Sequence, residues 1–163
     1  MLRELYLDNN KLNTLSENIF QNNKLLGILK ISYNNFSYLP KKVFQGLNLI
    51  RLTLKGNKNN NLQLEKQILA DKISITVLKI KNNIGLTELP QDIFENSLFI
   101  RTLSLNNNQL SFLPQNIFHT NIRLEYLNLS FNKLKELPFG IFNFNSQLKE
   151  LDLSMNQLTS ITL

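Results

Sequence analysis

Cationic side chains recur in the first half of the chain at positions that alternate with leucine or isoleucine. Ammonium and guanidinium groups form charge-assisted hydrogen bonds with carboxylates, so cations gathered on one surface would bind an acidic partner. We therefore expect a basic docking surface, provided that the fold brings these side chains together. The candidate residues are Lys30, Arg51, Lys55, Lys79 and Lys81, with Arg101 beside them and Tyr6 and Tyr33 near them.

Residues that could support catalysis are almost absent. The chain has one histidine, no cysteine and five scattered glycines, so it lacks a catalytic triad, a thiolate metal site and a glycine-rich phosphate loop. The single histidine, His119, follows Phe118 in an expected surface loop, and we interpret it as a solvated side chain. We expect a non-enzymatic protein without a metal or cofactor.

The net charge of +6 is unevenly distributed along the 163 residues. Residues 1–85 contain thirteen Lys or Arg and five Asp or Glu, a net charge of +8, whereas residues 86–163 contain five and seven, a net charge of −2. This asymmetry favours an acidic partner for the first half. We do not expect nucleic acid to be that partner, because few aromatic residues lie among the cations to stack on bases.

An internal repeat fixes the positions of these cations. Seven segments follow the pattern Leu-x-x-Leu-x-Leu-x-x-Asn, with Ile permitted for Leu, and they begin at residues 2, 26, 49, 75, 100, 124 and 148. Leu-x-Leu is typical of a short strand with alternate side chains on one face, and neighbouring strands must stack to bury their leucines. The Asn that ends each segment is expected to hydrogen-bond unpaired backbone groups of adjacent repeats, in a structural ladder. The ladder residues are Asn10, Asn34, Asn57, Asn83, Asn108, Asn132 and Asn156.

A second signal, Leu-Pro-x-x-Ile-Phe with Val permitted for Ile, follows the strand segment in four repeats. All four prolines of the chain occupy its second position. Proline has a fixed φ and no N–H donor, which suits the start of a segment outside the sheet. The Phe residues, 24 positions apart where the repeats are regular, predict a second ladder on the opposite side of the core. The motif begins at Leu39, Leu89, Leu113 and Leu137.

Together these motifs resemble the leucine-rich repeat superfamily over essentially the whole chain. The 24-residue period resembles the "typical" subclass of Toll-like receptors, Slit proteins and lamprey variable lymphocyte receptors, although cysteine-rich caps are absent here. The resemblance implies an α/β-type solenoid, a leucine-rich repeat horseshoe of about seven repeats with a concave parallel β-sheet and convex loops or short 3₁₀ turns. It also implies that another protein or an acidic macromolecular ligand binds on the concave face.

With the repeats aligned, the residues between the leucines face outward, and the cations of repeats two to four fall together. Two interpretations remain open: a docking surface for an acidic partner, or an ordinary solvated sheet face whose charge maintains solubility. Extra residues at 58–61 in repeat three and at 84–85 in repeat four predict loops at one edge. These loops represent either tolerated drift or a binding loop beside the basic half.

We interpret residues 1–163 as a single repeat domain and expect it to be an uncapped segment of a longer protein, because no turn would cover the first leucines. Two glycosylation sequons, at Asn35 and Asn128, point to an extracellular or cell-surface glycoprotein. Asn35 is the better placed, since Asn128 is expected on the concave strand. The main hypothesis is a binding segment of a Toll-like receptor ectodomain, and the alternative is a cytoplasmic scaffold that organises protein complexes.

Overall fold

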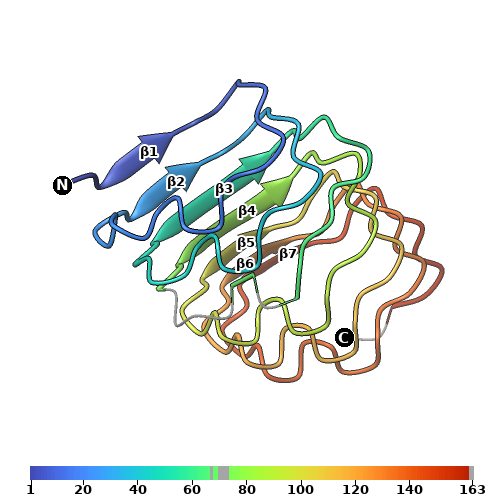
Figure 1. Ribbon diagram of the computed structural model, residues 1–163. Coiled ribbons are helices and arrows are strands. Elements are labelled where there is room, and N and C mark those ends of the chain that lie inside the picture. The colour runs from blue at the N-terminus through green and yellow to red at the C-terminus, as the bar shows by residue number, and fades with distance from the viewer. Residues whose placement is uncertain (67, 70–73, 162–163) are drawn as a thin grey trace.

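Seven short parallel strands lie side by side in chain order in the computed structural model (Figure 1). The structure describes residues 1–66, 68–69 and 74–161. Each strand falls on a predicted Leu-x-Leu segment, so the predicted parallel-sheet solenoid is confirmed. The strands are β1 (Glu4–Tyr6), β2 (Ile28–Lys30), β3 (Arg51–Lys55), β4 (Val77–Lys81), β5 (Thr102–Ser104), β6 (Tyr126–Asn128) and β7 (Glu150–Asp152).

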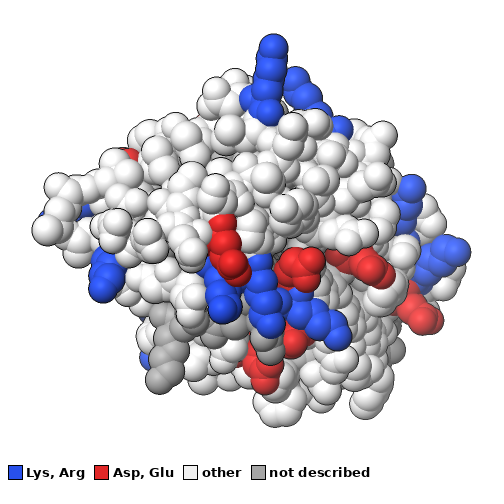
Figure 2. Space-filling view, in the orientation of Figure 1, with Lys and Arg blue, Asp and Glu red and all other residues white. Residues whose placement is uncertain are grey.

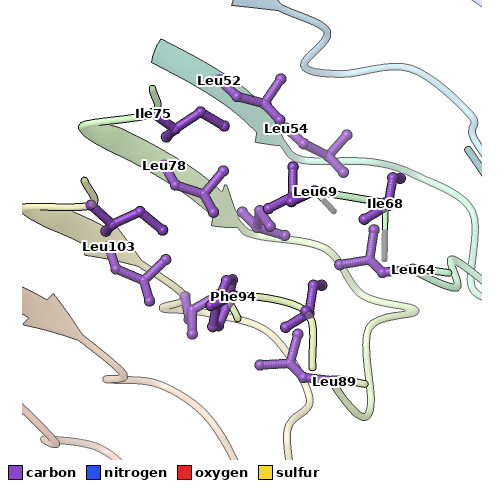
Figure 3. Packing of buried hydrophobic residues seen from close by; sticks show 14 of the residues in the cluster. Leu52, Leu54, Leu64, Ile68, Leu69, Ile75, Leu78, Leu89, Phe94 and Leu103 are labelled. Atoms are coloured by element: carbon purple, nitrogen blue, oxygen red, sulfur yellow. The ribbon is translucent and has the colours of Figure 1, made fainter. Parts of the chain in front are cut away.

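The register keeps every repeat in step, because the central leucine of each strand pairs with the central leucine of the next. On β3, Leu52 and Leu54 are buried while Arg51, Thr53 and Lys55 between them reach the surface. Figure 3 shows the leucines of β3 and β4 pointing toward apolar side chains of the convex segments. The leucines therefore form one continuous core, and the residues between them form the outer face of the sheet.

The convex segments are loops built around single turns. The carbonyl of each motif proline accepts a hydrogen bond from the N–H three residues later, as Pro90 does from Ile93 and Pro114 from Ile117. No helix occurs in the described ranges. Each turn directs an Ile-Phe pair into the core, so the proline motif supplies the second wall of the solenoid.

The phenylalanine ladder lies inside that wall. The rings of Phe94 and Phe118 stack with their centroids 6.1 Å apart, and those of Phe118 and Phe142 with centroids 6.0 Å apart. Phe94 and Phe118 are completely buried. Parallel stacking at this distance follows from the 24-residue repeat, which places one ring per turn at the same height.

The strand-end asparagines connect each turn to the one before it. Asn132, for example, accepts a hydrogen bond from the Leu110 N–H at 3.1 Å and donates to the Leu105 carbonyl at 3.0 Å, both in the preceding repeat. It also donates to carbonyls of its own turn. Asn57 deviates, because its amide both accepts from and donates to the backbone of Phe36. Asn10 bonds only carbonyls of its own turn, those of Leu7 and Asp8.

A second polar ladder, which the sequence analysis missed, lies on the convex side. Buried Asn121 donates to the carbonyls of Phe94 and Ser97, and buried Asn145 donates to those of Phe118 and Asn121. These residues follow the ladder phenylalanines by three positions, so the pattern Phe-x-x-Asn was the available signal. The two ladders satisfy backbone groups on both sides of the core, which burial would otherwise make costly.

The first and last turns are less completely packed than the inner ones. Leu5 and Leu7 at one end, and Leu151 and Leu153 at the other, are only partly buried, while the corresponding inner leucines are fully buried.

Among the described residues, no helix has the length and hydropathy needed to cross a membrane.

Candidate functional site

The outer face of β2, β3 and β4 carries an open hollow of about 360 Å³. The hollow is lined by five cations together with small polar residues and one carboxylate. This arrangement brings together the five cations that the sequence singled out. We call these five the basic cluster: Lys30, Arg51, Lys55, Lys79 and Lys81.

The sheet register explains why these side chains meet. Lys30 and Lys79 stand opposite Thr53 on the two neighbouring strands, and Lys55 stands opposite Lys81. Arg51 and Lys55 point to the same face as Thr53 because they are two positions away on the same strand. Thr53 therefore lies at the centre of the basic cluster and also lines the hollow. Spacing placed Thr53 in the outward row, but its small neutral side chain gave no signal of this central position.

Among the described residues, no member of the basic cluster forms an ion pair. Within the described ranges, the ion pairs are Arg101–Glu125 and Lys149–Glu125, neither of which includes a member of the cluster. The one carboxylate that lines the hollow, Asp8, accepts a hydrogen bond from the Ser32 N–H at 2.6 Å.

Burial and the positive charges of its neighbours lower the pKa of Lys79, and among these charges Lys81 and Arg51 have the largest effects. The environment of Lys79 therefore disfavours its own positive charge. Like charges held this close repel one another, and a bound anion would reduce this repulsion.

Two tyrosines stand at the edge of the basic cluster. The Lys30 ammonium lies 4.7 Å from the centroid of the Tyr6 ring, and the Lys55 ammonium lies 5.3 Å from that of Tyr33. Both contacts are within cation–π range. The hydroxyl of Tyr6 also donates to the carboxylate of Glu4, and this hydrogen bond raises the pKa of Tyr6. The tyrosines thus help to hold the positions of two lysines.

Gly56 makes room for the Tyr33 ring. A Cβ atom at Gly56 would lie 2.6 Å from two ring carbons of Tyr33, a distance that no real contact tolerates. Both residues have positive φ, 63° for Gly56 and 56° for Tyr33. Every repeat has a residue of positive φ just before its ladder asparagine, and only repeat three places glycine there. Glycine therefore supplies both the backbone angle and the space for the ring.

Arg101 stands apart from the basic cluster. Its guanidinium pairs with Glu125, whose other oxygen accepts a hydrogen bond from the Lys149 ammonium at 2.6 Å. Hydrogen bonds from Lys149 and then Arg101 lower the pKa of Glu125. Arg101 is absent from the lining of the hollow, so its charge serves a contact between repeats.

The outer face of β6 and β7 contains a network of neutral and acidic groups. Asn128 donates to Asp152 at 3.1 Å, and the hydroxyl of Ser130 donates to Asn128 at 2.7 Å. Ser154 donates to Asp152 through both its backbone N–H and its hydroxyl, and these bonds lower the pKa of Asp152. Polar groups on this half of the face therefore satisfy one another.

The insertions of repeats three and four pack against each other. A Cβ atom on Gly85 would lie 2.4 Å from the carbonyl carbon of Asn60, so the backbone of the repeat-three loop rests directly on this glycine. Asn59 also donates to the carbonyl of Asn35 in repeat two, at 3.4 Å. The loop is therefore seated on both neighbouring repeats.

The convex side offers no catalytic arrangement in the part of the chain that the structure describes. His119 is exposed, and its Nδ1 lies 2.7 Å from the carbonyl oxygen of Asn116. Lys66, Asp92 and Glu95 line a hollow of about 220 Å³ near it. No group of three or more metal-ligating side chains occurs among the described residues.

Figure 2, in the orientation of Figure 1, shows Lys and Arg interleaved with Asp and Glu on the visible face, so neither sign dominates there.

The two sequons have different environments. The Asn35 side chain is exposed, and its amide donates to Asn13 at 3.3 Å. The Asn128 side chain is part of the β6–β7 network, where a glycan would displace the hydrogen bonds to Asp152 and Ser130.

Comparison with known proteins agrees with this architecture. The family profile described as "Leucine rich repeat" matches residues 1–58, 73–134 and 122–163. Since these matches cover nearly the whole sequence, the chain belongs to the leucine-rich repeat family.

Individual relatives are more distant. Prolargin from Rattus norvegicus and from Mus musculus is 31% identical over 118 residues, which is 66% of this chain and 31% of each relative. A chain in the structure of the Toll–Spatzle complex, described as a molecular hub in Drosophila development and innate immunity, is 28% identical. It has a TM-score of 0.88, and the match covers 96% of this chain and 20% of that one.

Two further solved structures share the fold. A chain of the LRIM1/APL1C complex is 26% identical with a TM-score of 0.78, and the match covers 97% of this chain and 30% of that one. The TLR13–ssRNA13 complex, at 24% identity, has a TM-score of 0.89 with 98% and 22% covered. The chain thus spans about a third or less of the length of each of these proteins.

Proposed function

We propose that this chain is a non-enzymatic binding segment of an extracellular, Toll-like receptor ectodomain, and that its basic cluster binds an acidic surface of a protein partner. The observation that carries the proposal is the convergence of five cations in one hollow with no ion-pair partner in the described ranges. Charged groups that serve only solubility are usually mixed in sign on a protein surface.

The relatives support a binding role of this kind. The Toll–Spatzle and LRIM1/APL1C structures are protein complexes, and in each the matched chain aligns with almost the entire chain described here. The TLR13 structure is a complex with single-stranded RNA, but its identity to this chain supports the fold alone. We favour a protein partner because the cations form a compact cluster, whereas binding of a nucleic-acid strand needs cations along a path.

The binding test uses a fluorescent poly-glutamate peptide and the purified chain, measured by anisotropy. Reversing two central charges in the variant Lys55→Glu/Lys79→Glu should weaken binding at least a hundredfold, because attraction becomes repulsion. The matched control, Lys133→Glu/Lys135→Glu, changes the same net charge at two exposed positions in repeat six. Equal losses in the two variants would show that only net charge matters and would refute a specific basic site.

The extracellular assignment needs a separate test, because an intracellular scaffold could use the same basic cluster. Antibodies against this chain should label intact, unpermeabilised cells that express the native gene. We also expect the native protein to lose mass on enzymatic removal of N-glycans, with Asn35→Gln abolishing the change. Labelling only after permeabilisation, with no glycan, would establish the scaffold alternative.

A further inference from the structure

The geometry of the basic cluster points to a particular chemical group. We infer that the hollow is a site for a phosphate monoester, carried on a side chain of the acidic protein partner and seated over Thr53. This inference rests on the proposed binding role of the cluster and narrows it from a general acidic surface to one tetrahedral dianion.

The first argument is the placement of cationic residues around Thr53 in the sheet. Lys30 and Lys79 flank Thr53 on the neighbouring strands, whose backbones lie about 4.8 Å from that of β3. Arg51 and Lys55 flank it along β3, each about 6.6–6.8 Å away. Four cationic residues therefore surround Thr53 on the outer face of the sheet, and Lys81 adds a fifth on the diagonal. The ammonium groups of Lys30 and Lys55 rest against the rings of Tyr6 and Tyr33 at the edge of the same hollow.

The second argument is the shape of the ligand that the ring of cations around Thr53 can bind. A carboxylate is planar, has two oxygens and carries one charge, so it can engage only part of the ring. A phosphate monoester has three terminal acceptor oxygens and carries a charge of about −1.5 to −2 at neutral pH. Only the second group has enough acceptors and enough charge to bond cations on opposite sides at once.

The third argument is that hydroxyl donors in the hollow are left unused. Within the described ranges, the hydroxyls of Thr53 and Ser32 make no hydrogen bond, although both residues line the hollow. In the other half of the same face, the hydroxyls of Ser130 and Ser154 are bonded to Asn128 and Asp152. The floor of the basic cluster therefore offers free donors beneath a ring of cations, a combination that suits a phosphate oxygen.

The test compares two fluorescent peptides with identical glycine-rich flanks, one with phosphoserine and one with glutamate at the centre. Poly-glutamate serves as the probe of the general acidic site. We expect the purified chain to bind the phosphoserine peptide at least tenfold more tightly than the glutamate peptide. Measurements at low and at physiological ionic strength show how much of the affinity comes from electrostatic attraction, which salt screens.

Two neutral substitutions test the residues. Thr53→Val keeps the shape of the side chain and removes its hydroxyl, and it should weaken phosphoserine binding about tenfold while poly-glutamate binding stays unchanged. Lys30→Gln should weaken phosphoserine binding by at least as much, whereas the control Lys133→Gln should have no effect.

A third substitution places an anion of the protein itself among the cations. Thr53→Glu places a carboxylate among the cations, so it should abolish phosphoserine binding and raise the melting temperature by about 2–4 °C through relief of repulsion. The control Thr102→Glu lies between Val77 and Tyr126 in the register and should not raise it. A lower melting temperature for Thr53→Glu would contradict the assigned charge geometry.

The outcomes separate the two proposals. If glutamate and phosphoserine peptides bind equally, or if Thr53→Val leaves phosphoserine binding intact, the phosphate site is refuted while the acidic docking surface stands. If neither peptide nor poly-glutamate binds, both are refuted.

Discussion

The two halves of the outer face of the sheet share one scaffold but differ in how their polar groups are satisfied. On β2 to β4, five cations gather around Thr53 without a carboxylate partner in the described part of the chain. On β6 and β7, Asn128, Asp152 and their neighbouring serines bond one another in the same sheet rows. The register continues through both halves without change. The scaffold therefore leaves the outward residues free to vary, and the first half gathers five cations that form no ion pair among the described residues.

This comparison predicts first that the ladder asparagines contribute equally to stability in the two halves. Replacing a buried ladder asparagine by alanine, as in Asn57→Ala or Asn132→Ala, should cost about 3 kcal/mol in either half, because buried backbone groups lose their partners. Urea unfolding measures this free energy. Asn10→Ala is the control, since that exposed amide bonds only its own turn and should cost well under about 1 kcal/mol. A large cost in one half alone would show that the halves differ in their backbone support.

The second prediction concerns removal of a charge from the basic half. Lys79→Met should stabilise the chain at pH 7 by up to about 1 kcal/mol, because it removes a repelled cation and keeps the apolar stem. The pKa of Lys79 is lower in the folded than in the unfolded protein, so its destabilising effect disappears as pH rises through the folded value toward 10.5.

The advantage of Lys79→Met should therefore shrink as the pH rises toward 10.5, a change that denaturation at several pH values can detect. Lys133→Met serves as the control on an exposed position. Destabilisation by Lys79→Met at neutral pH would show that the cluster is already satisfied within the protein. The same variant should bind poly-glutamate less tightly, a trade of function for stability.

The smallest predicted effect has the opposite sign and lies in the other half. Asp152→Asn should destabilise the chain by a few tenths of a kcal/mol at pH 7, because hydrogen bonds from Ser154 favour the ionised carboxyl. The pKa of Asp152 is depressed in the folded state, so this stabilisation is present above 3.8 and is lost as pH falls through the lower folded value. Wild type and variant should thus converge in stability under strongly acidic conditions. Equal stabilities at pH 7 would show that the network contributes nothing to folding.

The sequence by itself determined the repeat, the strands and the outward rows. The period-two alternation of leucine fixes which residues face the core, and one repeat per 23 to 26 residues aligns equivalent positions in adjacent strands. These two regularities place Lys30, Lys55 and Lys79 on one face without any knowledge of coordinates. The phenylalanine ladder follows from the same period.

Only the tertiary structure decided which outward residues act together. Spacing put Arg101 beside the basic cluster, but Glu125 in the next repeat takes its charge. The central position of Thr53, the seat that Gly56 provides for Tyr33, and the packing of Gly85 under the inserted loop depend on distances between strands and loops. A repeat pattern specifies the row of a residue, whereas the choice among partners within reach depends on side-chain packing and charge in three dimensions.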